Sequence, residues 1–227
     1  MGYTEIMRKN LLTNNEIYHI FSRSIADFMI FNDEVEFNRM EQLLRYYQIQ
    51  NELRFSDFLE TKIVLKNGFD SSFDIISKDK EGSVQIIAYC FMPTHIHLIL
   101  KQLTEKGISK YMNNVLNGFS RYFNIKHRRK GPLWESRFKS VLVETDEQLL
   151  HLTRYIHLNP VTAELVDRPE DWIFSSYRDY LSKDDGVTSI CQFEDILELN
   201  PEEYHKFVND RISYQREIAK VKSLLIE

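Results

Sequence analysis

Two histidines stand two positions apart in residues 91–98, which read FMPTHIHL. They lie within an apolar run over residues 86–100 that is rich in β-branched and aromatic side chains, which predicts a strand of a sheet core. Side chains at positions i and i+2 of a strand project to the same face, with their Cα atoms about 7 Å apart. His95 and His97 can therefore converge on one metal ion, while Ile96 packs against the opposite face. The pair alone does not distinguish a metal site from two hydrogen-bonded core histidines.

A tyrosine and an asparagine lie one helical turn apart further along the chain, where residues 146–159 predict a helix. Helical side chains four positions apart are neighbours, about 6 Å from one another, so the side chains of Tyr155 and Asn159 can reach the same position. A tyrosine on a half-buried stripe and an asparagine before Pro160 are also ordinary features of a helix. The spacing alone therefore leaves their role open.

The limits of this helix can be read from its flanking residues. Thr145 and Gln148 have the spacing of a capping box, which predicts that the helix begins directly after Thr145. Pro160 disfavours helical geometry in the residue before it, which predicts that the helix ends near Asn159.

The rest of the chain predicts an alternation of strands and helices. Residues 18–23 and 138–143 are typical of short strands, a helix is expected from Asn32 to Tyr47, and residues 108–123 form a continuous helical apolar face. The order strand, helix, strand, helix, strand, with a further helix at the end, indicates an α+β sandwich in which helices cover one face of an antiparallel sheet.

The organisation of the chain follows from the same pattern. We expect one domain over residues 1–182, with an insertion at about 48–82, where the pattern is less regular. Residues 183–227 are expected to form a C-terminal helical tail, with helical patterns around 193–198 and 201–224.

The amino-acid composition limits the classes of protein to which this chain can belong. At 43% hydrophobic and 28% charged residues, the 227-residue chain has the composition of an ordinary globular protein. No apolar stretch approaches the roughly 20 residues that span a bilayer, and the N-terminus lacks the apolar segment of a signal peptide. Cys90 and Cys191 are far apart and form no CxxC motif, so a cytoplasmic protein without membrane association is expected.

The charge is unevenly distributed along the chain. The net charge is −5, but residues 101–139 hold ten Lys or Arg against two Glu and so carry +8, which leaves −13 on the remainder. A basic segment on an acidic body predicts a surface for a polyanion such as nucleic acid, although a solvated helix end followed by a basic loop would give the same pattern. The candidate phosphate-binding residues are Arg121, Lys126, Arg128, Arg129, Lys130, Arg137 and Lys139.

Three motifs in this order resemble one protein family. Residues 92–98, MPTHIHL, resemble the HUH motif of single-tyrosine transposases, and residues 117–140 are similar to the linking segment of their REP-associated branch. Residues 154–161, RYIHLNPV, together with Trp172 and the SSY of 175–177, match that branch. The chain thus resembles the REP-associated tyrosine transposases of the IS200-like superfamily over about residues 18–180, interrupted at 48–82.

The resemblance implies a fold and a chemistry. It implies a ferredoxin-like sheet, a divalent metal ion held by His95, His97 and Asn159, and Tyr155 as the nucleophile that forms a 5′-phosphotyrosine with single-stranded DNA flanking a hairpin. Family behaviour implies Mg²⁺ or Mn²⁺, whereas ligand softness alone favours Mn²⁺, Zn²⁺ or Ni²⁺ over Mg²⁺. Both monomers and homodimers occur among such proteins.

Two other functions remain compatible with the sequence. A domesticated regulator would bind hairpin DNA without cutting it. A metal-dependent nuclease would use water as the nucleophile, with Tyr155 serving only the structure.

Overall fold

The centre of the protein is a four-stranded sheet, described here from a computed structural model that covers residues 12–78, 80–181 and 189–217. The strands are β1 (Ile17–Arg23), β2 (Val84–Met92), β3 (His95–Gln102) and β4 (Lys139–Val143). Their order is β2-β3-β1-β4, and every neighbouring pair is antiparallel. The long connections from β1 to β2 and from β3 to β4 contain helices, so the predicted α+β, ferredoxin-like architecture is confirmed.

The apolar run around the two histidines forms two strands instead of the single strand expected. The chain turns at Pro93 and Thr94, and β2 and β3 then pair as a hairpin in which Met92 lies opposite His95. Proline cannot donate a ladder hydrogen bond, so it interrupts a strand that side-chain type alone would continue. As a result, His95 is the first residue of β3.

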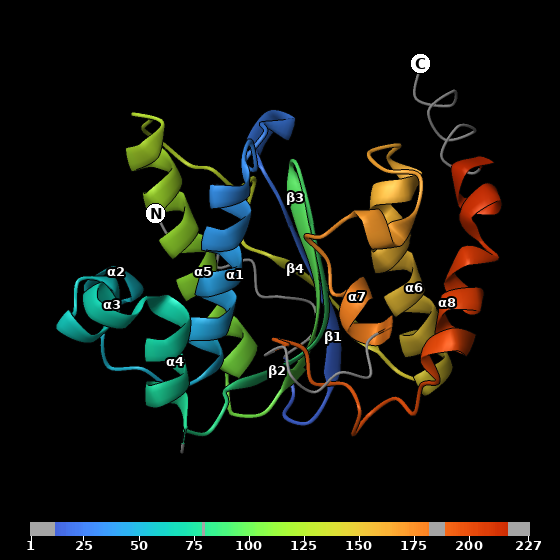
Figure 1. The fold of residues 1–227 in the computed structure, drawn as a ribbon, viewed down its shortest axis with the longest axis horizontal. Coiled ribbons are helices and arrows are strands. Elements are labelled where there is room, and N and C mark those ends of the chain that lie inside the picture. Colours follow the sequence, from blue (N-terminus) through green and yellow to red (C-terminus); the bar gives the residue numbers. More distant parts are fainter. Residues whose placement is uncertain (1–11, 79, 182–188, 218–227) are drawn as a thin grey trace, which may run out of the picture.

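Two helices cover one face of the sheet, as Figure 1 shows. They are α1 (Glu34–Gln48), which begins where the Asp33 side chain accepts a hydrogen bond from the Glu36 amide, and α5 (Gly107–Lys126). The two helices pack closely, since a Cβ atom on Gly118 would lie only 2.9 Å from Cδ2 of Leu43. Their apolar faces and one face of the sheet form most of the core.

The helices that follow β4 lie on the other face of the sheet (Figure 1). They are α6 (Asp146–Thr162), α7 (Tyr177–Leu181) and α8 (Pro201–Asn209). Strand β2 is buried along its whole length because it has helices on both sides, which explains its apolar run over residues 86–92. The second helical layer was not part of the expected sandwich, which had helices on one face only.

The α6 helix begins as predicted but ends later. The Thr145 side chain accepts a hydrogen bond from the Gln148 amide, as a capping residue does. The prediction that the helix ends near Asn159 was wrong, since it continues through Pro160 to Thr162. Proline costs the helix one hydrogen bond, but Pro160 and Val161 are buried and their packing favours the additional helical residues.

The irregular segment at 48–82 is helical for much of its length. It contains α2 (Phe55–Leu59), α3 (Lys62–Asn67) and α4 (Phe69–Ser77), which lie on the outer side of α1 (Figure 1). The buried Arg45 of α1 forms an ion pair with Asp70 of α4. That this segment is an insertion stays a prediction.

The C-terminal part only partly follows the predicted helical pattern. Residues 194–196 form a turn where a helix was expected, whereas α8 and residues 212–217 are helical as expected. The remainder of the pattern, at 218–224, lies outside the described residues. Two short 3₁₀ segments, Ile25–Asp27 and Pro169–Asp171, complete the described elements.

Candidate active site

The two histidines of the HUH-like motif lie side by side on the face of β3 that α6 covers. Their ring centroids are 5.1 Å apart and their planes are nearly perpendicular, at 84°. His97 is buried and His95 is half-buried. The period-2 alternation of the strand therefore brings both imidazoles to one side, as the sequence predicts.

Tyr155 of α6 faces these histidines across the sheet surface. Its ring centroid lies 5.9 Å from that of His97, edge-on at 87°. The side chain remains 42% exposed, so its hydroxyl group is accessible to a large substrate. Residues nearly sixty positions apart thus meet at one place because α6 crosses back over the sheet.

A third histidine that sequence analysis missed, His19 of β1, lies beside His97. Nε2 of His19 is 2.9 Å from Nδ1 of His97, a hydrogen-bond distance, and the two rings are stacked at 5.2 Å. The ring of His19 also lies 6.3 Å from that of Tyr155. The alternation of β1 places His19 on one face, but only the pairing of β1 with β3 shows that this face carries His97.

His95, His97 and Tyr155 line a pocket of about 330 Å³, whereas His19 and Asn159 are not among its lining residues. The charged residues of its lining are three cations, Arg23, Arg137 and Lys139, and one carboxylate, Glu135. Arg23 is the second residue that sequence analysis missed. It enters the pocket because it pairs with His95 in the β1–β3 ladder.

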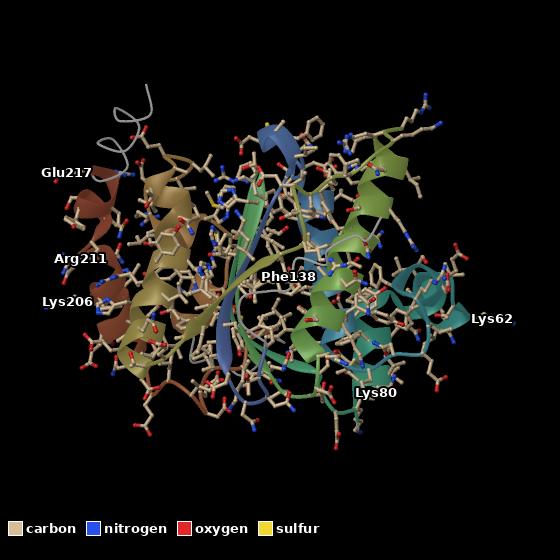
Figure 2. The ribbon with its side chains drawn as sticks, turned by 180° about the vertical axis from the view of Figure 1, so that it is seen from behind. Lys62, Lys80, Phe138, Lys206, Arg211 and Glu217 are labelled. Atoms are coloured by element: carbon tan, nitrogen blue, oxygen red, sulfur yellow. The ribbon has the colours of Figure 1, made fainter. Side chains whose placement is uncertain are left out.

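The predicted residues Arg137 and Lys139 reach the pocket from the start of β4. Phe138, labelled in Figure 2, is buried between them, so it anchors this part of the chain. Because side chains alternate along an extended chain, the two cations share the side opposite Phe138.

Burial keeps the histidines of the site neutral. It lowers the pKa of His19 and of His95 to about 4, and it lowers the pKa of His97 well below its usual value. A neutral imidazole has a lone pair on one ring nitrogen, which is the form that binds a metal ion.

The nucleophile candidate is held in its protonated form. Burial raises the pKa of Tyr155, and the positive charge of Arg23 acts in the opposite direction. Any attack by this hydroxyl group therefore requires further positive charge near it.

The residues present fit a divalent metal ion. Nδ1 of His95 is 3.0 Å from the Thr94 hydroxyl, and Nδ1 of His97 is bonded to His19, whereas Nε2 of neither ring has a hydrogen bond among the described residues. Asn159, one turn after Tyr155, has a buried Nδ2 atom that finds no partner in the described part of the chain. This N–H donor lacks an acceptor, which is costly for a buried group, whereas the atom of Asn159 that could bind a metal ion is the amide oxygen, Oδ1. No three His, Cys, Asp or Glu side chains within the described ranges are grouped to hold a metal ion, and the predicted set contains only two such residues, both of them histidines.

The other predicted phosphate-binding residues lie away from the pocket. Arg121 is exposed on α5, and Arg128 and Lys130 are exposed after its C-terminus. The guanidinium group of Arg129 lies 5.3 Å from the ring centroid of the exposed Phe28.

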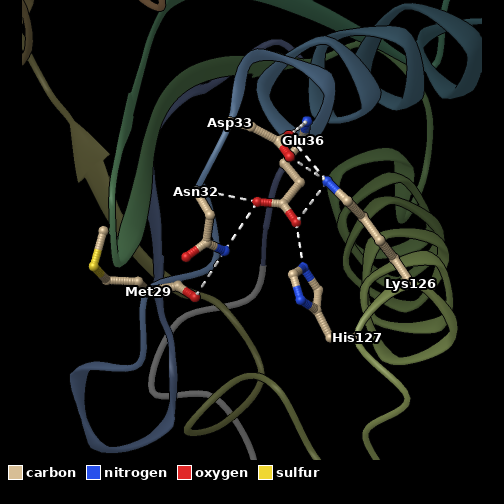
Figure 3. A network of polar contacts seen from close by, with 6 residues as sticks. All are labelled: Met29, Asn32, Asp33, Glu36, Lys126 and His127. Atoms are coloured by element: carbon tan, nitrogen blue, oxygen red, sulfur yellow. Dashed lines mark hydrogen bonds and ion pairs between the residues drawn. The ribbon is translucent and has the colours of Figure 1, made fainter.

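Lys126 has partners inside the protein, as Figure 3 shows. Its ammonium group lies 2.7 Å from Asp33 and 3.1 Å from the fully buried Glu36, which also contacts His127. These contacts join the end of α5 to the start of α1. The structure thus gives Lys126 a structural role, and the sequence could not reveal it because its partners are some ninety residues away.

No helix in the described ranges is both long and apolar enough to cross a membrane.

Comparison with known proteins shows which of them this chain resembles. A family model described as "Transposase IS200 like" matches residues 61–159, a range that contains His95, His97, Tyr155 and Asn159. A protein of Haemophilus influenzae, provisionally named a REP-associated tyrosine transposase, is 31% identical over 105 residues, which are 41% of this chain and 58% of that protein. This chain therefore spans little more than half the length of that relative.

A solved structure has the same fold. It is a REP-associated tyrosine transposase bound to a REP hairpin, with a TM-score of 0.54 at 15% identity over 88% of this chain and 96% of that one. Residues 61–159 of this chain are thus similar to the IS200-like transposases, and its fold is similar to that of a REP-associated tyrosine transposase.

Proposed function

We propose that this protein is a transposase that cleaves and rejoins single-stranded DNA beside a hairpin through a covalent bond to Tyr155. The observation that carries the proposal is the position of the Tyr155 ring, edge-on to His97 at 5.9 Å in a pocket whose rim holds three cations. The relationship to IS200-like transposases and the hairpin bound to the structural relative support the choice of substrate.

The cations on the rim would bind the phosphate that is cut. Arg23, Arg137 and Lys139 can neutralise the phosphate oxygens, which otherwise repel an incoming oxygen nucleophile. The charge of Arg23 also favours the phenolate form of Tyr155, since it opposes the increase in pKa that burial causes.

His95, His97 and Asn159 would hold a divalent ion, Mg²⁺ or Mn²⁺. When bound, such an ion withdraws charge from the phosphate and from the phenol as a Lewis acid. The chain supplies neutral imidazoles for it, because burial keeps the pKa of both histidines below neutrality.

The reaction itself is a transesterification. The phenol gives up its proton, its oxygen attacks the phosphorus atom, and the bond from phosphorus to the 3′ oxygen breaks. The 3′ oxygen takes up a proton and leaves as a hydroxyl group, while the 5′ phosphate stays on Tyr155. Attack by a 3′ hydroxyl group on this ester reverses the step, so the energy of the phosphodiester is retained for joining.

Incubation of labelled hairpin DNA with single-stranded flanks, protein and Mn²⁺ tests the proposal. We expect a denaturant-resistant adduct with the wild type and with Tyr214→Phe, a control at a tyrosine that is 51% exposed on another helix. Tyr155→Phe should bind the DNA but form no adduct. Turnover without an adduct would support the water-using nuclease, and binding without cleavage would support the regulator.

We also propose that one chain provides a complete site. Tyr155 faces the histidines of its own chain, which favours action as a monomer. A mixture of Tyr155→Phe and His97→Ala proteins should then form no adduct. Restored activity in the mixture would instead show that Tyr155 serves the histidines of a second chain in a homodimer.

A further inference from the structure

We propose that His19 is a positioning residue that fixes the tautomer of His97, so that Nε2 of His97 keeps the lone pair with which it would bind a metal ion. This inference rests on the proposed function, because it assigns His97 to a metal site. It adds a residue of β1 to a site that the motif places only on β3 and α6.

The geometry of the pair fits such a role. Nε2 of His19 and Nδ1 of His97 are 2.9 Å apart, and the stacked rings leave His97 little freedom to turn. Phe21 stacks near His97 as well, with ring centroids 6.1 Å apart. His97 is therefore held on the β1 side by two ring contacts and one polar contact.

The hydrogen bond can exist in two forms with opposite consequences. If His19 donates to Nδ1 of His97, the proton of neutral His97 lies on Nε2, and that nitrogen cannot bind a metal ion. If His97 donates from Nδ1 to His19, Nε2 of His97 keeps its lone pair. Metal-binding histidines commonly donate their second ring N–H to a fixed acceptor, and here that acceptor is an imidazole.

The described residues offer His97 no other acceptor at Nδ1. His95 has a hydroxyl group in the corresponding place, since Thr94 lies 3.0 Å from its Nδ1 atom. His19, His95 and His97 do not form a group that could hold a metal ion among themselves, so His19 is assigned to orientation and not to coordination.

Nitrogen NMR of histidine-labelled full-length protein, without metal, tests the tautomer directly. We expect wild-type His97 to carry its proton on Nδ1. In His19→Phe, which keeps a ring but has no acceptor, His97 should no longer prefer the Nδ1–H tautomer. His19→Gln supplies an amide oxygen as an acceptor and should restore part of this preference.

Titration with Mn²⁺ alone gives a second readout. His19→Phe should weaken Mn²⁺ binding by about ten- to a hundredfold, the usual effect of losing such a partner. His19→Gln should weaken it less. The control is Val141→Ala, because Val141 is exposed and lies opposite His19 in the β1–β4 ladder, and we expect it to bind Mn²⁺ as the wild type does.

The outcomes separate this inference from the proposed function. A folded His19→Phe protein with unchanged His97 tautomer and Mn²⁺ affinity would overturn the inference, even if the wild type forms the Tyr155 adduct. A wild type with the Nδ1–H tautomer and His19-dependent Mn²⁺ binding would support it, even if no adduct forms. A wild type in which His97 carries its proton on Nε2, or which binds no Mn²⁺, would also overturn it.

Discussion

Arg23 and His95 lie opposite one another in the β1–β3 ladder, and this pairing brings a cation into the pocket that holds Tyr155. The guanidinium group lies near enough for its charge to oppose the effect of burial on the pKa of Tyr155. Arg23 also forms an ion pair with Asp27, at 3.3 Å, in which both side chains remain accessible to solvent. A phosphate could therefore replace Asp27 as the partner of Arg23.

Replacement of Arg23 should make Tyr155 harder to ionise. In Arg23→Ala the charge that opposes the increase in the pKa of Tyr155 is lost, so adduct formation should need a higher pH and be slower at neutral pH. The pH profile of the adduct rate measures this shift. Asp27→Asn is the control, because it releases Arg23 and should not slow the reaction. An unchanged pH profile in Arg23→Ala would contradict the assigned role.

Arg137 and Lys139 should contribute to DNA binding through phosphates. Each lost contact to single-stranded DNA reduces the slope of log affinity against log salt by about 0.7, so the double variant to alanine should lower the slope by about 1.4. Fluorescence anisotropy at several salt concentrations gives this slope. Lys206→Ala is a matched control, since Lys206 is exposed on α8 at the edge of the view in Figure 2, whereas Phe138, which lies between Arg137 and Lys139 in the chain, is near its centre. Equal slopes for the double variant and the wild type would place the DNA elsewhere.

Asn159 should serve metal binding at the expense of stability. The Oδ1 atom would bind the metal ion, while the buried Nδ2 donor has no partner among the described residues and is therefore unfavourable. Asn159→Leu, of similar size, should therefore keep or increase the free energy of unfolding while weakening Mn²⁺ binding by at least about tenfold. Urea denaturation and Mn²⁺ titration measure the two effects. A loss of stability together with normal Mn²⁺ binding would indicate a purely structural asparagine.

The cluster around Glu36 in Figure 3 should make stability depend on pH. Burial acts to raise the pKa of Glu36, but hydrogen bonds from Asn32, His127 and Lys126 prevail and hold it below its usual value of 4.5. A carboxylate whose pKa is lower in the folded state stabilises the protein above the unfolded pKa of 4.5, and this contribution disappears as the pH falls through the folded value.

Glu36→Gln should thus reduce the free energy of unfolding by about 1–3 kcal/mol at neutral pH. The difference from the wild type should shrink below pH 4.5, which urea denaturation across a pH series will show. Glu34→Gln, at an exposed position in the same helical turn, should have little effect at any pH. A difference for Glu36→Gln that grows as the pH falls would show the opposite linkage.

The C-terminal part of the chain should support the helix that carries Tyr155. Nδ1 of the fully buried His157 lies 2.7 Å from the Tyr204 hydroxyl of α8, and the guanidinium group of Arg154 lies 4.0 Å from the Phe207 ring centroid. Tyr204→Phe leaves a buried imidazole nitrogen unpaired and should cost about 1–3 kcal/mol of unfolding free energy. Urea denaturation tests this, with the exposed Tyr214→Phe as control, and equal stability of the two variants would refute the role of α8.

The sequence was sufficient for features that depend on local periodicity. A strand repeats every two residues and a helix every 3.6, so His95 and His97 had to share a face, and Tyr155 and Asn159 had to lie one turn apart on a helix that Thr145 caps. Pro93 shows the limit of such patterns, because side-chain type predicted one strand where the backbone forms a hairpin.

Only the tertiary structure decided which other residues reach the site. His19 and Arg23 lie there because β1 pairs with β3 in one particular register, and a shift of one residue would place both on the opposite face. Lys126, which the sequence presents as one more basic residue, is held by Asp33 and Glu36 from a distant segment. Side-chain spacing is a local property of the chain, whereas strand register and long-range ion pairs depend on how the whole sheet and its helices pack.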